Sequence, residues 1–522
     1  MKCFFPVSQA FVFLSFVAFV CICATCRADD PSKGMAAKLA EICRKRNVPA
    51  MAVAVVNANG LVQSQCFGNR KRETSGKVEL SDRFPIGSNT KSMTATLAAV
   101  LVEAGKIDWE TTIGDVWPIA NDVDIHPQLR KITLDQLLSH QSGLAENISD
   151  ISGQAWAKFF EEKQSPTLER RGMLKIVLSP APTHPQGKYA YSNLGYAVVS
   201  AMLETRAKES FESLMKKHVF DPLEMRSADF RSMKSAQQLK SPLLWGHQAD
   251  GGKSVDPRTV GAENPTVYAA AGTVHLSIVD YAKYARWQLA GKPTPVLRSQ
   301  SAYDHLHEPL VDKAPSEKYG CGWICLDSGV GPALTHAGSN TNAFSVIWVF
   351  PKSDFAVVVC TNSGEPQAFP ACDEMISHLM MELAVNKAVV VATPSLGQNR
   401  DAESVDKPST QKETKKMSEP ENFLSKCVGK WQGTVKTWFE PGKLADESKV
   451  SGEIVSLMNR KFFRHTYEGS MKGKPRHGEE TLAMNSITKK FQVCWFDDFH
   501  MNTAILISEG DAIEHGLSLI HI

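Results

Sequence analysis

The segment from residue 391 to residue 420 constrains the fold most strongly, because it contains almost no large apolar side chain. Ser, Thr, Lys, Glu and Asp dominate it, and a stretch of this composition cannot bury enough surface to fold by itself. A chain of 522 residues is also too long for one ordinary domain. We therefore predict two folded domains, residues 29–390 and 421–522, joined by a disordered linker at residues 391–420.

The first residues of the chain have the pattern of an export signal. Lys2 supplies a positive charge, Ala10–Ala24 is almost wholly apolar, and Cys26–Ala28 places small residues at both cleavage positions. The apolar run is shorter than the roughly 20 residues that a bilayer requires. We predict a cleaved signal peptide at residues 1–28 and a periplasmic or extracellular protein. An uncleaved membrane anchor and lipidation at a cysteine of this segment remain alternatives.

Composition and charge argue against some classes of partner. The chain has 43% hydrophobic and 22% charged residues, which is typical of a soluble globular protein. The net charge is +2, and Lys and Arg do not form a stripe interleaved with aromatic residues, so we expect no nucleic-acid partner. No glycine-rich nucleotide loop follows an expected strand, and no cofactor is predicted.

The cysteines and histidines lack the spacing of a zinc site, so the sequence predicts no metal. The cysteines outside the expected signal peptide are scattered, which favours buried thiols over a disulfide framework. Cys321 and Cys325 are close in sequence, but four residues of extended strand separate their Cα atoms by roughly 13 Å, beyond disulfide reach. A bridge between them would need a turn.

Strand patterns stand at both ends of the first domain. Ala50–Val56 and Leu61–Phe67 flank a turn at Gly60 and predict a hairpin. Ala343–Phe350 and Phe355–Thr361 predict a second hairpin, and segments of helical periodicity lie between the two. This order indicates an α+β domain whose terminal segments share one antiparallel sheet.

Ser-x-x-Lys on a helix places a hydroxyl and an amine one turn apart, so the amine can take the hydroxyl proton. The motif is unspecific, because the chain contains it five times, at Ser88, Ser213, Ser404, Ser409 and Ser486. Only Ser88 follows a glycine and precedes a long apolar helix pattern, Met93–Ala104. Spacing alone leaves Ser88 open as a nucleophile or as a helix cap.

Six blocks of residues around this motif occur in the same order as in a known family: Phe84–Ser92, Leu101–Ile107, Ile132–Leu144, Tyr189–Tyr196, Tyr319–Trp323 and His336–Gly338. Through these blocks the chain resembles the class C β-lactamases, DD-peptidases and related esterases, which are similar to penicillin-binding proteins. The resemblance covers roughly residues 36–388. It implies a β-lactamase/transpeptidase-like antiparallel sheet flanked by helices, with an all-helical subdomain.

The resemblance also implies the roles of individual residues. Ser88 matches the nucleophile, and Lys91 and Tyr191 match the groups that move its proton. The backbone N–H groups of Ser88 and Ser339 would form the oxyanion hole, which commonly contributes a few kcal/mol to transition-state stabilisation. Asn193 would orient the substrate amide or hold Lys91. For Tyr191, a core aromatic is the alternative.

His336 is where the chain departs from the family pattern. β-Lactamases and many DD-peptidases carry Lys-Thr-Gly or a close variant where this chain has His336-Ala337-Gly338, and the lysine helps to hold a substrate carboxylate. A neutral imidazole does so poorly. We expect His336 and Gly338 to contact substrate, with local packing as the alternative for His336. His140, in another block, is expected to be a buried structural histidine.

The sequence therefore predicts an exported serine hydrolase that forms an acyl-enzyme with an ester or a D-amino-acid peptide or amide. The substrate would be a small molecule or a peptidoglycan-like peptide, and the oligomeric state is left open. A true class C β-lactamase or DD-carboxypeptidase is the first alternative. A catalytically inactive binding or scaffold protein is the second.

The last hundred residues form a small all-β domain in this interpretation, with six short strands. Gly429–Gly433 and Glu440–Lys443 weakly resemble a lipocalin-like bacterial domain of unknown function. A lipocalin barrel needs about eight strands to close, so we predict an incomplete barrel, with a truncated C-terminus as one alternative. The six expected strands are Trp431–Phe439, Lys449–Met458, Phe462–Glu468, Glu479–Met484, Phe491–Phe496 and Thr503–Ser508.

Overall fold

The chain divides into two compact units, the first ending at Val390 and the second beginning at Val391. The predicted signal peptide, and the predicted linker from residue 393 onwards, lie outside the described residues. The computed structural model describes residues 31–118, 123–231, 233–238, 240, 242–328, 331–392, 428–440, 443–457, 462–471, 474–484, 491–497, 506–513 and 516–521.

The first unit is built around an eight-stranded sheet with the order β2-β1-β13-β12-β11-β10-β9-β8, in which neighbouring strands are antiparallel. Val53 of β1 lies opposite Val359 of β13. The two ends of the unit therefore share one sheet, and both predicted hairpins are confirmed. The strands are β1 (Ala50–Asn57), β2 (Gly60–Gly68), β8 (Val311–Ala314), β9 (Glu317–Tyr319), β10 (Ile324–Asp327), β11 (Pro332–Ser339), β12 (Phe344–Phe350) and β13 (Phe355–Thr361).

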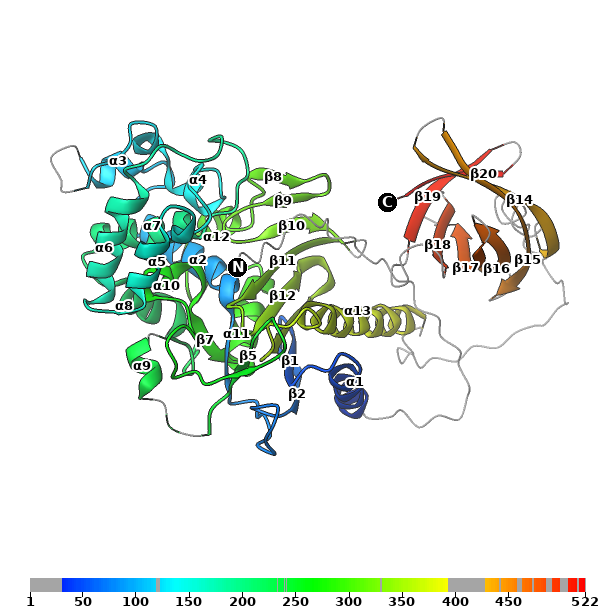
Figure 1. Cartoon of the computed structure of the whole chain (residues 1–522), viewed down its shortest axis with the longest axis horizontal. Helices are drawn as coiled ribbons and strands as arrows, with labels where there is room; N and C mark the ends of the chain where they lie inside the picture. Colours follow the sequence, from blue (N-terminus) through cyan, green and yellow to red (C-terminus); the bar gives the residue numbers. More distant parts are fainter. Residues whose placement is uncertain are drawn as a thin grey trace, which may run out of the picture. The chain divides into compact units, whose positions relative to one another are not determined.

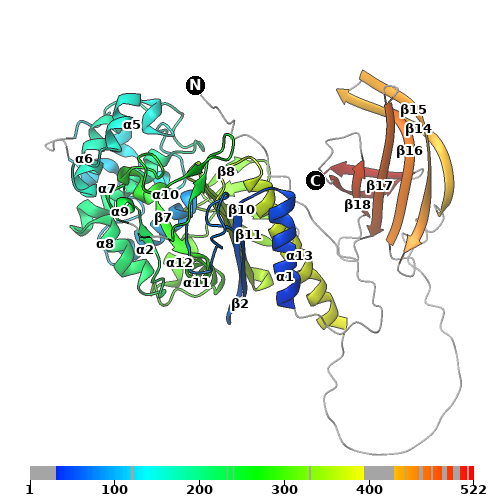
Figure 2. The same cartoon turned by 60° about the horizontal axis from the view of Figure 1, so that its bottom comes forward.

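Helices cover both faces of this sheet (Figure 2). α1 (Pro31–Lys45) and α13 (Ala368–Ala392) lie side by side along one face, where Lys45 pairs with Glu374 at 2.9 Å. α11 (Ile278–Leu289) packs on the other face, against β1 and β13. Because both faces are covered, β1 is buried along nearly its whole length. This is why its sequence is a continuous run of Ala, Val and Met.

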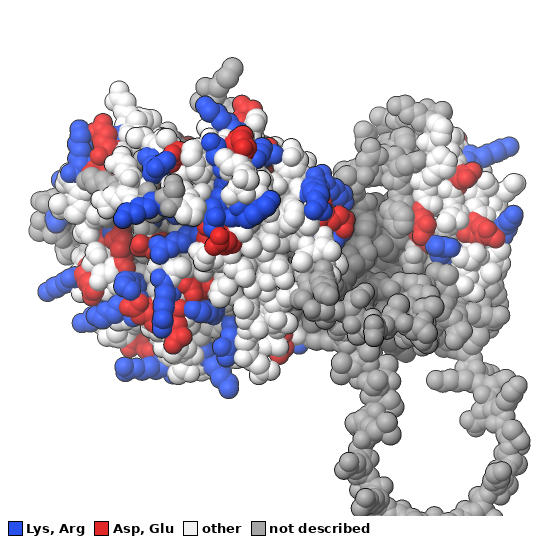
Figure 3. All heavy atoms as spheres, turned by 90° about the horizontal axis from the view of Figure 1, so that it is seen from below, with Lys and Arg blue, Asp and Glu red and all other residues white. Residues whose placement is uncertain are grey.

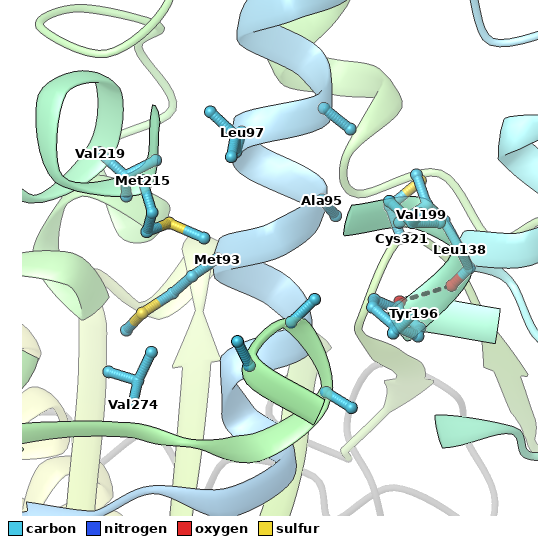
Figure 4. Packing of buried hydrophobic residues seen from close by; sticks show 14 of the residues in the cluster. Met93, Ala95, Leu97, Leu138, Tyr196, Val199, Met215, Val219, Val274 and Cys321 are labelled. Atoms are coloured by element: carbon cyan, nitrogen blue, oxygen red, sulfur yellow. Dashed lines mark hydrogen bonds between the residues drawn. The ribbon is translucent and has the colours of Figure 1, made fainter. Parts of the chain in front are cut away.

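An all-helical subdomain stands beside the sheet (Figure 1), as the resemblance implies. At its centre α2 (Thr90–Glu103) is buried on almost every side, although its first two turns carry several polar side chains. Figure 4 shows Met93 and Leu97 of α2 facing Met215 and Val219. The surrounding helices are α3 (Ile113–Val116), α4 (Leu134–Leu138), α5 (Gly153–Phe159), α6 (Pro166–Val177), α7 (Asn193–Ala207) and α8 (Phe211–Met215).

A buried ion-pair network ties α6, α7 and α8 together. Arg170 is fully buried and pairs with Glu204 at 2.5 Å and with Glu212 at 2.8 Å. It also donates to the carbonyl of Thr266 at 3.2 Å. Buried ion pairs of this kind need every member in place. The network therefore fixes the short turn that Thr266 begins and that carries Tyr268.

Short elements connect these layers. A three-stranded sheet with the order β3-β7-β4 leads into the N-terminus of α2. Its strands are β3 (Arg83–Pro85), β7 (Val274–Ser277) and β4 (Asp229–Phe230), and the other short elements are β5 (Gly246–His247), β6 (Ser254–Val255), α9 (Met233–Gln237), α10 (Ala269–Gly272) and α12 (Gln300–His305), with the single turns η1 (Gly87–Asn89), η2 (Leu129–Lys131), η3 (Ile148–Asp150), η4 (Lys216–Phe220), η5 (Thr266–Tyr268) and η6 (Pro351–Ser353).

The second unit is one antiparallel sheet of seven strands that follow one another in sequence order. The prediction of a small all-β domain is confirmed, but the expected count of six strands was one too low, because the apolar segment at 516–521 was not counted as a strand. β14 and β20 lie at opposite edges, so the sheet is open among the residues described. The strands are β14 (Gly429–Glu440), β15 (Lys443–Leu457), β16 (Phe462–Met471), β17 (Lys474–Met484), β18 (Phe491–Asp497), β19 (Leu506–Ile513) and β20 (Gly516–His521).

Candidate active site

Ser88 lies in η1, the short turn that leads from β3 directly into α2. The turn passes very close to the end of β11, and Gly87 makes this possible. Gly87 has a φ of +49°, and a Cβ atom there would lie 2.4 Å from the backbone nitrogen of Ser339. Any other residue would be strained and would clash. The sequence therefore requires Gly87 next to Ser88 for a geometric reason.

Gly338 of β11 lies equally close to the backbone of the turn at Ser88. A Cβ atom on Gly338 would lie 2.0 Å from the carbonyl oxygen of Ile86 and 2.7 Å from the backbone nitrogen of Ser88. The two glycines thus bring the backbone nitrogens of Ser88 and Ser339 to neighbouring positions. This is the arrangement in which two N–H groups are able to share one oxyanion.

Lys91 is fully buried one turn after Ser88. Its Nζ lies 3.0 Å from Ser88 Oγ, 2.7 Å from Asn193 Oδ1 and 2.8 Å from the carbonyl oxygen of Ala271. Burial holds the pKa of Lys91 well below its usual value, although the carboxylate of Glu146 opposes this shift. A neutral amine that donates its two N–H bonds to Asn193 and Ala271 keeps its lone pair for the Ser88 hydroxyl.

Tyr191 also contacts the hydroxyl of Ser88. Its Oη lies 2.7 Å from Ser88 Oγ and donates to it, and its ring faces Lys91 Nζ at 4.8 Å from the ring centroid. Burial raises the pKa of the Tyr191 phenol. Burial thus favours the neutral form of both groups that contact the serine oxygen, the phenol of Tyr191 and the amine of Lys91.

Asn193 is the first residue of α7, and its side chain links Lys91 to Asn147. It accepts from Lys91 through Oδ1 and donates through Nδ2 to Asn147 Oδ1 at 2.8 Å. The structure thus brings together Ser88, Lys91, Tyr191 and Asn193. No sequence pattern pointed to Asn147, because this residue lies in a loop whose path depends on the fold.

His336 is placed differently from the expectation of a substrate contact. It is 5% exposed, and it does not line the cavity next to Ser88. Nε2 bonds to Tyr319 Oη at 3.0 Å and Nδ1 to the Ala337 carbonyl at 2.7 Å. Burial, with a further contribution from Lys91, lowers its pKa to about 3. This placement favours the alternative of local bonding for His336.

A chain of hydrogen bonds through two buried histidines runs behind the site. The Ser192 N–H donates to His140 Nδ1 at 3.1 Å, and His140 Nε2 lies 3.2 Å from Tyr319 Oη. A neutral His140 must therefore carry its proton on Nε2 and donate to Tyr319. Tyr319 then donates to His336, which leaves the Nδ1 proton of His336 for the Ala337 carbonyl. The expectation of a buried His140 is confirmed.

A cavity of about 280 Å³ opens onto Ser88. Asn340, at its wall, donates to the buried carboxylate of Glu263 at 3.0 Å, and the same carboxylate bonds to His275 at 2.9 Å. The loop that follows Ser339 is therefore fixed from below. The lining includes no Lys or Arg side chain; it consists of Ser88, Asn147, Ser149, Trp156, Asn193, Asn264, Tyr268, Ala271, Gly272, Ser339, Asn340 and Thr341.

The fold and this cluster define a serine hydrolase of the kind that works through a Ser-x-x-Lys pair. A family model described as Beta-lactamase matches residues 33–378, so the chain belongs to that family. Residues 416–521 match a second model, described as a protein of unknown function (DUF1579).

Several known proteins are similar to the chain. It is 26% identical over 367 residues to Penicillin-binding protein 4 of Amycolatopsis lactamdurans, covering 67% of this chain and 90% of that protein. It is 28% identical over 245 residues to Unguisins hydrolase ungD of Aspergillus violaceofuscus, covering 45% of this chain but only 41% of that protein. The crystal structure of a D-stereospecific amidohydrolase from Streptomyces sp. has the same fold, with a TM-score of 0.53, 19% identity, and coverage of 66% of this chain and 97% of that one.

The buried state of His336 predicts how stability changes with acid. Its pKa is about 3 in the folded chain and about 6.5 in an unfolded one, so between these values only the unfolded state binds the proton. The contribution of the neutral His336 to the free energy of unfolding is therefore fully present above pH 6.5. Below that pH it decreases by about 1.4 kcal/mol per pH unit. His336→Asn removes this contribution. In urea unfolding, the free energy of unfolding of the wild type minus that of the variant should decrease by about 1.4 kcal/mol per pH unit from pH 6 to pH 4. A difference that stays constant over this range would contradict the low pKa of His336.

Proposed function

We propose that the protein hydrolyses an ester or a D-amino-acid peptide or amide through a covalent acyl-enzyme on Ser88. One observation carries this proposal: Ser88 Oγ is held between the amine of Lys91 at 3.0 Å and the phenol of Tyr191 at 2.7 Å, beside an open cavity. These are the distances at which a nucleophile is activated by a neighbouring base.

In the acylation step, Ser88 Oγ attacks the acyl carbon and its proton passes to the lone pair of Lys91. The negative charge that develops on the acyl oxygen is stabilised by the N–H groups of Ser88 and Ser339. Tyr191 gives its proton to the leaving group and regains one from Lys91, both groups being bonded to the same serine oxygen. Water then attacks the acyl-enzyme, and the proton transfers run in reverse.

The charge around the cavity favours neutral or cationic substrates. The lining contains no Lys or Arg to pair with a substrate carboxylate, whereas Glu146 acts electrostatically on both Lys91 and Tyr191. Burial and the neighbouring Asp150 raise the pKa of Glu146, and Lys91 and His184 only partly oppose this shift. An ester or a peptide without a free carboxylate next to the scissile bond suits this environment.

Two other functions compete. A β-lactamase or DD-carboxypeptidase uses the same machinery, and the similarity to Penicillin-binding protein 4 favours it. Within the proposed function, the similarity to a D-stereospecific amidohydrolase favours amide hydrolysis. An inactive scaffold is disfavoured, because the three-way bonding of Lys91 and the bond from Tyr191 would serve no purpose around an idle Ser88.

We also propose that the protein is exported to the periplasm or the outside of the cell, on the basis of the signal-like residues 1–28. Among the described helices, none combines enough length and apolar character to cross a bilayer. N-terminal sequencing of the protein recovered from its host should begin near Asp29. A chain that still begins at Met1 would contradict cleavage.

Labelling by a fluorophosphonate tests the nucleophile. Wild-type protein should become labelled, Ser88→Ala should not, and Lys91→Ala should react about 10² to 10⁴ times more slowly, because the general base is lost. The matched control is Ser213→Ala, which removes the exposed serine of another Ser-x-x-Lys copy in α8. It should label like wild type. Absence of labelling in the wild type would support the inactive scaffold instead.

Substrate preference is tested by comparing p-nitrophenyl esters with nitrocefin, whose carboxylate has no cation to meet in the cavity. We expect kcat/KM for the ester to be at least about tenfold higher, since leaving a buried charge unpaired costs more than the 1.4 kcal/mol that a factor of ten represents. Ser88→Ala supplies the background rate for both substrates. Efficient nitrocefin cleavage would instead assign the protein to the β-lactamase alternative.

A further inference from the structure

Three metal-ligating side chains from distant parts of the sequence meet on the first unit, separately from the Ser88 cluster. Asp135 is near the start of α4, His305 ends α12, and Cys321 lies between β9 and β10. One ligand atom of each lies within 4.8 Å of the other two. Asp135 Oδ1 and His305 Nε2 are 2.9 Å apart.

The types of atom in this cluster suit one class of ion. A carboxylate oxygen, an imidazole nitrogen and a thiolate sulfur are the ligands that zinc binds, and three protein ligands leave one position open for water. With the usual bond lengths, the ligand atoms around a tetrahedral zinc ion lie about 3 to 4 Å apart. Shifts of about an ångström therefore suffice to reach that geometry from the distances in the cluster.

The surroundings hold the imidazole ready to bind. His305 Nδ1 lies 3.4 Å from Glu308 Oε2, so the ring presents Nε2 to Asp135. A carboxylate behind the second ring nitrogen is the usual support of a metal-bound histidine. The ring of Trp109 packs against the His305 ring in a tilted arrangement, with 4.2 Å between the ring centroids, and the Trp109 carbonyl accepts from the Asp135 N–H at 3.2 Å. Trp109 thus braces two of the three ligands.

The three side chains lie at different depths, so an ion from solvent can reach the cluster from one side. Cys321 is fully buried and forms no disulfide, and Figure 4 places it beside Leu138 of α4, the helix that carries Asp135. The side chains of Asp135 and His305 are 16% and 18% exposed. The thiol therefore lies at the bottom of the cluster, and the carboxylate and the imidazole lie at its solvent side.

We propose that Asp135, His305 and Cys321 form a binding site for a divalent ion of the zinc class. On binding, the Cys321 thiol releases its proton to water and its sulfur bonds to the metal, together with Asp135 Oδ1 and His305 Nε2, while a water molecule takes the fourth position. The site needs no participation of Ser88 and is independent of the proposed hydrolase activity.

The expectation of no metal rested on the absence of a zinc-site spacing in the sequence, and these three ligands have no such spacing. Asp135 and His305 are 170 residues apart, whereas zinc motifs are recognised by short spacings between ligands. Only the packing of α4, α12 and the turn at Cys321 brings the three ligand atoms together.

Cobalt titration of the chelator-treated, reduced protein, prepared without a polyhistidine tag, tests the proposal. Wild type should bind one equivalent of Co²⁺ with a sulfur-to-cobalt charge-transfer band in the near ultraviolet, and Zn²⁺ should displace it. Cys321→Ser should lose the band, Asp135→Asn should weaken binding, and Glu308→Gln should weaken it about 10- to 100-fold through the lost support of His305.

The matched control is Cys325→Ser, which removes a neighbouring thiol whose Sγ contacts the carbonyl oxygens of His307 and Trp323. Its band and stoichiometry should equal those of wild type. Zn²⁺ should also raise the midpoint of thermal unfolding in wild type and Cys325→Ser but not in Cys321→Ser. The proposal is overturned if wild type shows no cobalt–thiolate band, or if the band survives Cys321→Ser or disappears with Cys325→Ser.

Discussion

Burial of the Lys91 amine is the constraint on which the candidate active site depends. An ammonium group without a carboxylate in direct contact is costly to bury, so the amine is driven towards its neutral form. The neutral amine donates its two N–H groups to Asn193 and to the Ala271 carbonyl. Its lone pair then points towards Ser88 and accepts from the serine hydroxyl. The surrounding structure preserves this geometry: α2 is buried on almost all sides, and Asn147 holds Asn193 in place.

A second constraint is the close contact between the turn at Ser88 and the end of β11. Gly87 and Gly338 remove the Cβ atoms that would separate the two backbones, so the large sheet and the helical subdomain meet at the serine. The hydrogen-bonded chain from Ser192 through His140 and Tyr319 to His336 joins the segment after Tyr191 to the same strand. Both histidines have a lowered pKa because they are buried, which suits a fixed positioning network better than a group that exchanges protons with substrate.

On the face of the first unit drawn in Figure 3, basic and acidic side chains are interspersed, so this face shows no preference for a partner of one sign. The cavity next to Ser88 is lined by polar amides and aromatic rings, and its lining contains no Lys or Arg side chain. The Asp135 cluster stands apart from that cavity, and none of its three side chains lines it. The proposed metal site and the proposed acyl-transfer site therefore share no side chain.

The sequence by itself determined the features that local patterns and the order of motifs encode. These include the two hairpins, the apolar helix after Ser88, the family, and the residues Lys91, Tyr191 and Asn193, because each is encoded by neighbours within a few positions. Tertiary structure decided the rest. Asn147, Tyr319 and Glu263 act through partners far away in the chain, His336 turned out to be buried behind its strand, and Asp135, His305 and Cys321 meet only after folding. The physical reason is that periodicity and spacing report which residues share an element, whereas the side chains that meet across elements depend on how buried surfaces pack.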